Sequence, residues 1–186
     1  MTTNNLYEEV IIAGFGGQGI ILAGKALAQT ALNAGKEVTY MPSYGAEMRG
    51  GTANSMVIIS DRPIASPTVS RPGSLIVMNK ASLSKFAPRL KPAGLLVFNS
   101  SLIENGPDLD EARILAIPAD DIAVELGNIK AANMVMLGAY LQQRQLFGPD
   151  AAAESLPEVL AERYHNMLPL NTEALKRGAE FAKTSR

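Results

Sequence analysis

The sequence predicts an α/β fold of three layers, in which helices cover both faces of one mostly parallel sheet of about six strands. Three observations support this prediction. Short, wholly apolar runs such as 10–13 suit strands that are buried on both faces. These runs alternate with stretches of helical pattern, and the first run ends in a glycine-rich loop directly before such a stretch. Alternation of this kind is typical of βα units.

The first half of the chain supplies most of the sheet. We expect strands at 10–13, 37–41, 55–60, 74–78 and 94–98, with helices at 20–34 and 81–86. Gly35 is predicted to close the first helix and Pro42 to end the second strand. The first strand, its loop, the first helix and the second strand together predict a Rossmann-like βαβ unit with a right-handed crossover.

The second half is mainly helical. We expect a sixth strand at 114–117 and helices at 119–126 and 133–143, the latter apolar all round and so predicted to pack deeply. Ser155 has capping-box spacing and predicts a helix from there to about His165. Asn171 is predicted to cap a last helix that ends near Thr184. We expect residues 1–186 to form a single domain.

Composition excludes several classes of function. The 17 basic and 18 acidic residues give a net charge of −1, so a strongly cationic nucleic-acid binder is excluded. There is no cysteine, hence no disulfide, thiolate nucleophile or cysteine-ligated cluster in this chain, and the single histidine argues against a histidine-rich metal site. No signal-peptide pattern or membrane span is present, so we expect a cytoplasmic protein without membrane contact.

The first glycine loop has the pattern G-x-G-x-x-G, in Gly14, Gly16 and Gly19, with Gly17 and Gln18 between them. Such loops bring backbone N–H groups close to a phosphate. A nicotinamide dinucleotide site also needs an acidic residue at the end of the second strand, which the sequence lacks. Two other interpretations remain open: the glycines permit close packing of helix and strand, or the loop binds another ligand or partner.

A second glycine-rich loop follows the second strand and contains two opposite charges. Its candidate binding residues are Tyr44, Gly45, Glu47, Arg49, Gly50 and Gly51. Both loops leave the carboxyl ends of strands, so we expect them at the same edge of the sheet, where α/β proteins bind ligands. The alternative is a surface ion pair between Glu47 and Arg49, which contributes little.

Together the two loops resemble a known family. Gly14-Phe-Gly-Gly-Gln-Gly19, then Ser43-Tyr-Gly-Ala-Glu-Met-Arg-Gly-Gly51 and the strand 55–60, are similar to the gamma subunit of 2-oxoacid:ferredoxin (acceptor) oxidoreductases. The form of the second loop is most like that of the 2-oxoglutarate and branched-chain 2-oxoacid members. The ordered pair of motifs carries this resemblance, which covers nearly the whole chain.

The resemblance implies a subunit, inactive alone, of a complex in anaerobic metabolism. That complex oxidatively decarboxylates a 2-oxoacid, with 2-oxoglutarate favoured over 2-oxoisovalerate, and passes the acyl group to coenzyme A and electrons to ferredoxin. The implied partners are alpha, beta and ferredoxin-like delta subunits, which would hold thiamine diphosphate and the iron–sulfur clusters. This chain would hold no cofactor alone and would contribute no catalytic residue or metal ligand. The isolated chain, with its partner surface exposed, could form a homodimer.

We therefore hypothesise that the two glycine loops face the catalytic subunits near the thiamine site. Arg49 or the loop N–H groups would there bind a carboxylate or the phosphates of coenzyme A. Two alternatives stay open, namely a stand-alone Rossmann-like nucleotide-binding protein and a purely structural scaffold subunit.

Overall fold

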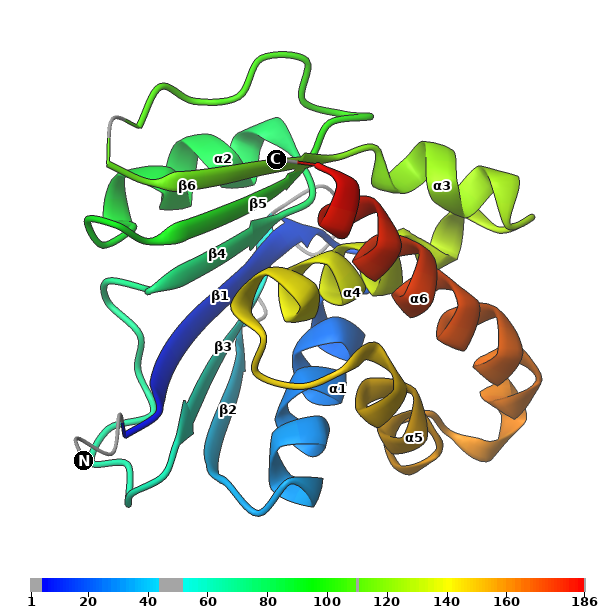
Figure 1. Ribbon diagram of the computed structural model, residues 1–186, viewed down its shortest axis with the longest axis horizontal. Coiled ribbons are helices and arrows are strands. Elements are labelled where there is room, and N and C mark those ends of the chain that lie inside the picture. Colours follow the sequence, from blue (N-terminus) through cyan, green and yellow to red (C-terminus); the bar gives the residue numbers. More distant parts are fainter. Residues whose placement is uncertain (1–4, 44–51, 110, 186) are drawn as a thin grey trace.

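A six-stranded sheet forms the centre of the computed structural model, which describes residues 5–43, 52–109 and 111–185 (Figure 1). In chain order the strands are β1 (Tyr7–Phe15), β2 (Glu37–Ser43), β3 (Thr52–Ser60), β4 (Ser74–Val77), β5 (Leu95–Asn99) and β6 (Arg113–Ile117). Their order across the sheet is β2-β3-β1-β4-β5-β6. Neighbours from β1 to β6 pair in parallel, whereas β3 is antiparallel to both β1 and β2. Only β3 therefore runs against the others, and the predicted mostly parallel sheet is confirmed.

The Rossmann-like first unit departs from the prediction in one respect, because β3 lies between β1 and β2. It pairs along its whole length with β1, from Tyr7 opposite Ser60 to Phe15 opposite Thr52. Residues 57–59 of β3 are apolar and fully buried, so β3 suits the interior of the sheet. β2 lies at the edge of the sheet and runs on through Pro42, which was predicted to end it. An edge strand tolerates this proline because the side that faces solvent needs no N–H group.

Helices cover both faces of the sheet, as predicted for three layers (Figure 1). They are α1 (Ile20–Asn33), α2 (Lys80–Phe86), α3 (Ala119–Glu125), α4 (Ala132–Arg144), α5 (Pro149–Val159) and α6 (Leu168–Thr184), with the 3₁₀ turns η1 (Ala87–Arg89), η2 (Ile129–Ala131) and η3 (Glu162–Met167). α2 packs on one face, and α1, α4, α5 and α6 pack on the other. None of the helices in the described residues has the length and apolar character needed to cross a membrane.

Each face has its own apolar core, because successive residues of a strand point to opposite sides. In β1, Val10 and Ile12 join the core beneath α1 and α4, whereas Ile11 and Ala13 join the core beneath α2. Residues 132–141 of α4 are all buried, which confirms the predicted deep packing of this helix.

Two predicted helix starts are wrong. Ser155 lies inside α5, where its hydroxyl donates to the carbonyl oxygen of Ala151 at 2.9 Å, and His165 lies in η3 beyond the end of α5. Asn171 lies within α6 and is buried, so it does not cap that helix. Both helices carry a proline in their first turn, which is a common signal for a helix start. The prediction instead used polar residues that lie further along each helix. At the end of α1, Gly35 has a φ of 72°, which confirms its predicted role.

Two glycines allow α4 and α6 to cross in backbone contact. A Cβ on Gly138 would lie 2.0 Å from the carbonyl oxygen of Leu175, and a Cβ on Gly178 would lie 1.9 Å from that of Val135. Neither position has room for a larger residue. The crossing fixes α4 against the sheet, and the start of α4 contributes to the candidate site described next.

Candidate functional site

The ends of both glycine-rich loops meet at the carboxyl edge of the sheet. The first loop connects Phe15 of β1 to Ile20 of α1, and Phe15 lies opposite Thr52, where β3 begins. Ser43, the last residue of β2, lies opposite Asn54 on β3. The second loop therefore starts and ends beside the first. Its candidate residues, Tyr44, Gly45, Glu47, Arg49, Gly50 and Gly51, lie outside the described residues, so their role stays a prediction.

The glycines of the first loop serve different purposes. A Cβ on Gly14 would lie 2.6 Å from Cδ1 of Ile20, and one on Gly19 would lie 2.3 Å from Nδ2 of Asn133. Close packing therefore explains these two. Gly16 and Gly17 are exposed, and Gly17 has a φ of 97° with open space around it. Packing among the described residues does not explain Gly17, whose positive φ instead favours glycine, and its backbone is open to a ligand or partner.

Gln18 holds the loop in shape. Its Oε1 accepts a hydrogen bond from the backbone N–H of Phe15 at 2.7 Å and another from Nδ2 of Asn79 at 3.0 Å. Asn79 follows β4 and caps α2, since its Oδ1 accepts from the backbone N–H of Ser82 at 2.9 Å. The loop after β1 is thus tied to the loop after β4. Within the described residues, no acceptor is bonded to the Nε2 group of Gln18, so it can donate to a ligand.

Asn133 fixes the start of α1 from the opposite side. Its Nδ2 donates to the carbonyl oxygen of Gly19 at 2.9 Å, and its side chain is buried. Gly19 has a φ of 71°, and no side chain of the described residues caps α1. The N–H groups in the first turn of α1 therefore keep the partial positive charge of an uncapped helix start. Sequence reasoning missed Asn79 and Asn133, because only the fold brings them to the loop.

A crevice opens where the helices change sides. α1 follows β1 onto one face and α2 follows β4 onto the other, and such switch points are where open α/β sheets bind ligands. A cavity of about 190 Å³ lies here. It is lined by Gly17, Gln18, Met78, Asp120, Ile129, Lys130 and Ala132. Asp120 lies in the first turn of α3, and Lys130 lies in η2.

The two charged groups of this cavity are not paired with each other. Oδ1 of Asp120 accepts from Nδ2 of the buried Asn99 at 2.7 Å, which fixes the carboxylate. Lys130 is exposed and forms no ion pair with any of the described residues. Together with the amides of the loop, the ammonium group suits an anionic or strongly polar ligand. Among the described residues at this edge, no nucleophile is paired with a base.

The dinucleotide interpretation gains no support. Glu37 begins β2 at the amino edge of the sheet, opposite Ser60, so it is far from the glycine loop. Within the described residues, no group of three acidic, histidine or cysteine side chains could hold a metal ion.

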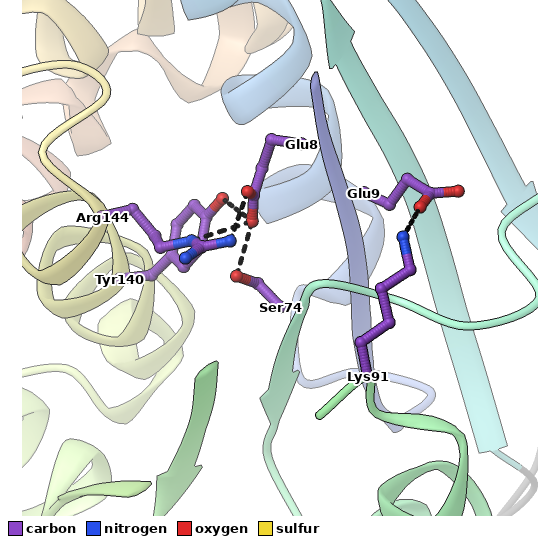
Figure 2. Close-up of polar contacts among 6 residues, drawn as sticks. All are labelled: Glu8, Glu9, Ser74, Lys91, Tyr140 and Arg144. Carbon is purple, nitrogen blue, oxygen red and sulfur yellow. Dashed lines mark hydrogen bonds and ion pairs between the residues drawn. The ribbon is translucent and has the colours of Figure 1, made fainter. Parts of the chain in front are cut away.

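The other edge of the sheet holds a buried polar cluster (Figure 2). Glu8 accepts hydrogen bonds from Arg144, from the Ser74 hydroxyl at 2.6 Å and from the Tyr140 hydroxyl at 3.4 Å. Burial raises the pKa of Tyr140 well above its usual value of 10.0. Burial alone would lower the pKa of Arg144, but the bond to Glu8 raises it. On the opposite side of β1, Lys91 binds Glu9. Both oxygens of the Glu8 carboxylate are thus bonded within the fold, and these bonds tie β1 to β4 and α4.

Comparison with known proteins decides the family. The family described as pyruvate ferredoxin/flavodoxin oxidoreductase matches residues 9–181, nearly the whole chain. The chain belongs to this family. The resemblance carried by the two glycine loops is therefore confirmed.

Curated members of the family include close relatives of two kinds. The chain is 36% identical to ketoisovalerate oxidoreductase subunit VorA of Methanothermobacter thermautotrophicus, over 94% of this chain and 36% of the relative. It is 34% identical to 2-oxoglutarate synthase subunit KorC of Methanocaldococcus jannaschii, over 95% of this chain and 94% of the relative. The chain thus spans about a third of the VorA relative that it matches and nearly all of KorC.

Solved structures of the family share the fold. The gamma subunit of a keto/oxoacid ferredoxin oxidoreductase from Geobacter sulfurreducens superposes with a TM-score of 0.80 at 30% identity, covering 95% of this chain and 98% of that one. The 2-oxoglutarate:ferredoxin oxidoreductase from Magnetococcus marinus, with 2-oxoglutarate, coenzyme A and succinyl-CoA bound, gives 0.84 at 26% identity, covering 95% and 31%.

Proposed function

We propose that this chain is the gamma-type subunit of a 2-oxoacid:ferredoxin oxidoreductase. The observation that carries the proposal is the end-to-end match in fold and length with a family gamma subunit. The complex would convert a 2-oxoacid, coenzyme A and oxidised ferredoxin into an acyl-CoA, carbon dioxide and reduced ferredoxin. We favour 2-oxoglutarate over 2-oxoisovalerate as substrate, and the cytoplasm as location.

The chain's own residues support a binding role within that complex. Without cysteine it cannot hold an iron–sulfur cluster, so the clusters would lie in the alpha, beta and delta-type partners. The family resemblance implies that thiamine diphosphate lies there too. The exposed glycine loop and the Asp120–Lys130 crevice share the carboxyl edge. There, loop N–H groups, Gln18 Nε2, Lys130 and Arg49 would bind the phosphates of coenzyme A or a carboxylate. Coenzyme A supplies the thiol that takes up the acyl group.

Purification of a tagged chain from its native cells without oxygen tests the proposal. The eluate is assayed for reduction of a low-potential dye that requires coenzyme A, with 2-oxoglutarate, 2-oxoisovalerate or pyruvate. Larger subunits and activity on one acid would support the complex and name its substrate. A chain that purifies alone and inactive would instead favour a stand-alone nucleotide-binding protein.

The binding role needs its own test in the assembled complex. We expect Arg49→Ala and Lys130→Ala to raise the KM for coenzyme A without preventing assembly. Unchanged kinetics in a complex of normal composition would leave the chain a structural scaffold.

A further inference from the structure

β6 is an edge strand, and none of the described residues bonds to its outward backbone groups. The N–H of Arg113 donates to Gly94 at 2.8 Å, and the carbonyl of Ile117 accepts from Ser100 at 2.8 Å, so both residues bond toward β5. In a parallel pair, every second residue of a strand directs both its N–H and its C=O group to the neighbouring strand, and the residues between direct them the other way. The N–H and C=O groups of Ile114 and Ala116 therefore point away from the sheet. Both residues are exposed. This edge can accept another strand.

A positively charged groove lies beside that edge. A cavity of about 510 Å³ lies between β6 and the last turns of α4 and α6, at the amino edge and therefore away from the glycine loop. Its lining includes the apolar Leu95 and Leu115, three glutamines and the cations Arg113 and Lys183. Among the described residues, no acidic side chain lines it. The charge of the groove therefore favours a segment that carries carboxylates.

The two edges of the sheet differ in how they are protected. β2, at the other edge, begins with Glu37 and contains Pro42, two features by which natural edge strands avoid pairing. β6 begins with the charged Arg113 but contains no proline, and Ile114 leaves 42% of its surface in water. Antiparallel pairing of β6 with β6 of a second copy would add strand residues 113–117, which include an arginine and no acidic residue.

We propose that β6 binds an extended, acidic segment of another polypeptide as an added strand. The backbone of Ile114 and Ala116 would bond to the segment, while Arg113 and Lys183 would pair with its carboxylates. This inference does not depend on the proposed enzymatic function, because it rests only on the edge and the groove.

The test uses the full chain and two blocked peptides, one alternating Val with Glu and one alternating Val with Lys. Hydrogen exchange is followed at the amides of residues 114 and 116. We expect the Glu peptide to slow both amides and the Lys peptide to leave them unchanged. Equal effects of the two peptides, or no effect of either, would overturn the proposal. Dimerisation that protects these amides without peptide would assign the edge to a second copy and would also overturn it.

Two pairs of variants separate the backbone from the charge contribution. Ala116→Pro removes an outward N–H and should abolish binding, whereas Ala116→Thr keeps that group and should bind normally. Lys183→Glu should weaken the Glu peptide about fivefold, while Lys25→Glu, the same charge change on α1, should not. If Ala116→Pro fails to fold, the two charge variants still test the proposal. Retained affinity in Lys183→Glu would contradict the charge argument.

Discussion

Arg144, at the end of α4, forms a buried ion pair with Glu8 near the start of β1, across 136 positions of sequence (Figure 2). One bond runs from Nε to Oε1 at 3.0 Å, and a second joins Nη2 to Oε2. Ser74 and Tyr140 complete the coordination of the carboxylate. The pair fastens α4 to the centre of the sheet, and the other end of α4 supplies Asn133 to the candidate site.

Removal of one partner of this pair should destabilise the fold strongly. Arg144→Ala leaves the Glu8 carboxylate buried, with 7% of its side chain exposed, and should lower the free energy of unfolding by about 2–3 kcal/mol. The double variant Glu8→Gln/Arg144→Met should recover at least half of the loss, because no charge stays buried. Urea unfolding measures both. Lys176→Ala, which breaks an exposed pair with Asp150, is the control and should cost less than about 0.5 kcal/mol.

Tyr140 should make stability depend on alkaline pH. Its pKa is raised in the folded state, so the unfolded chain loses the proton first as the pH passes 10. Stability is complete below that pH and should then fall by up to about 1.4 kcal/mol per pH unit until the folded-state pKa is reached. Tyr140→Phe should lack this component in urea unfolding between pH 8 and 11. Tyr164→Phe, at a half-exposed site, should keep it; parallel curves for wild type and Tyr140→Phe would refute the prediction.

The glycine crossing of α4 and α6 should not tolerate a methyl group. Alanine favours a helix over glycine by about 1 kcal/mol, but at Gly138 its Cβ would overlap the Leu175 carbonyl and force the helices apart. We expect Gly138→Ala and Gly178→Ala each to destabilise by about 2–3 kcal/mol net. Gly148→Ala, where a Cβ has open space, loses only a favoured N-cap residue of α5 and should cost about 1 kcal/mol or less. Thermal and urea unfolding report the difference, and neutral values at both crossing positions would show that the contact relaxes.

Variants of Gln18 should separate its role in holding the loop from its role in binding a ligand. Gln18→Glu keeps an oxygen for the N–H of Phe15 and for Asn79, but it replaces the free donor with a negative charge. We expect stability within about 1 kcal/mol of wild type and a KM for coenzyme A raised about tenfold in the assembled complex. Gln18→Leu should also lower stability, because the N–H of Phe15 loses its acceptor. An unaltered KM in Gln18→Glu would place the ligand elsewhere.

The sequence by itself determined the layers of the fold, most of the strands and the family. Local patterns suffice for these, because apolar runs of strand length and a glycine loop between strand and helix are properties of neighbouring residues. The glycine motif also located one loop of the candidate site, and the order of the strands' carboxyl ends predicted its meeting with the second loop.

Only the tertiary structure decided which distant groups meet. The insertion of β3 between β1 and β2 depends on competition for buried positions across the sheet. Only after α3 and α4 have packed does Asn133 reach Gly19 and do Asp120 and Lys130 line one cavity with Gln18, which also bonds to Asn79. Side-chain amides and single charges are common throughout the chain, so no local pattern marks these as special. Their role comes from a shared position in space, which the packing of the whole chain fixes.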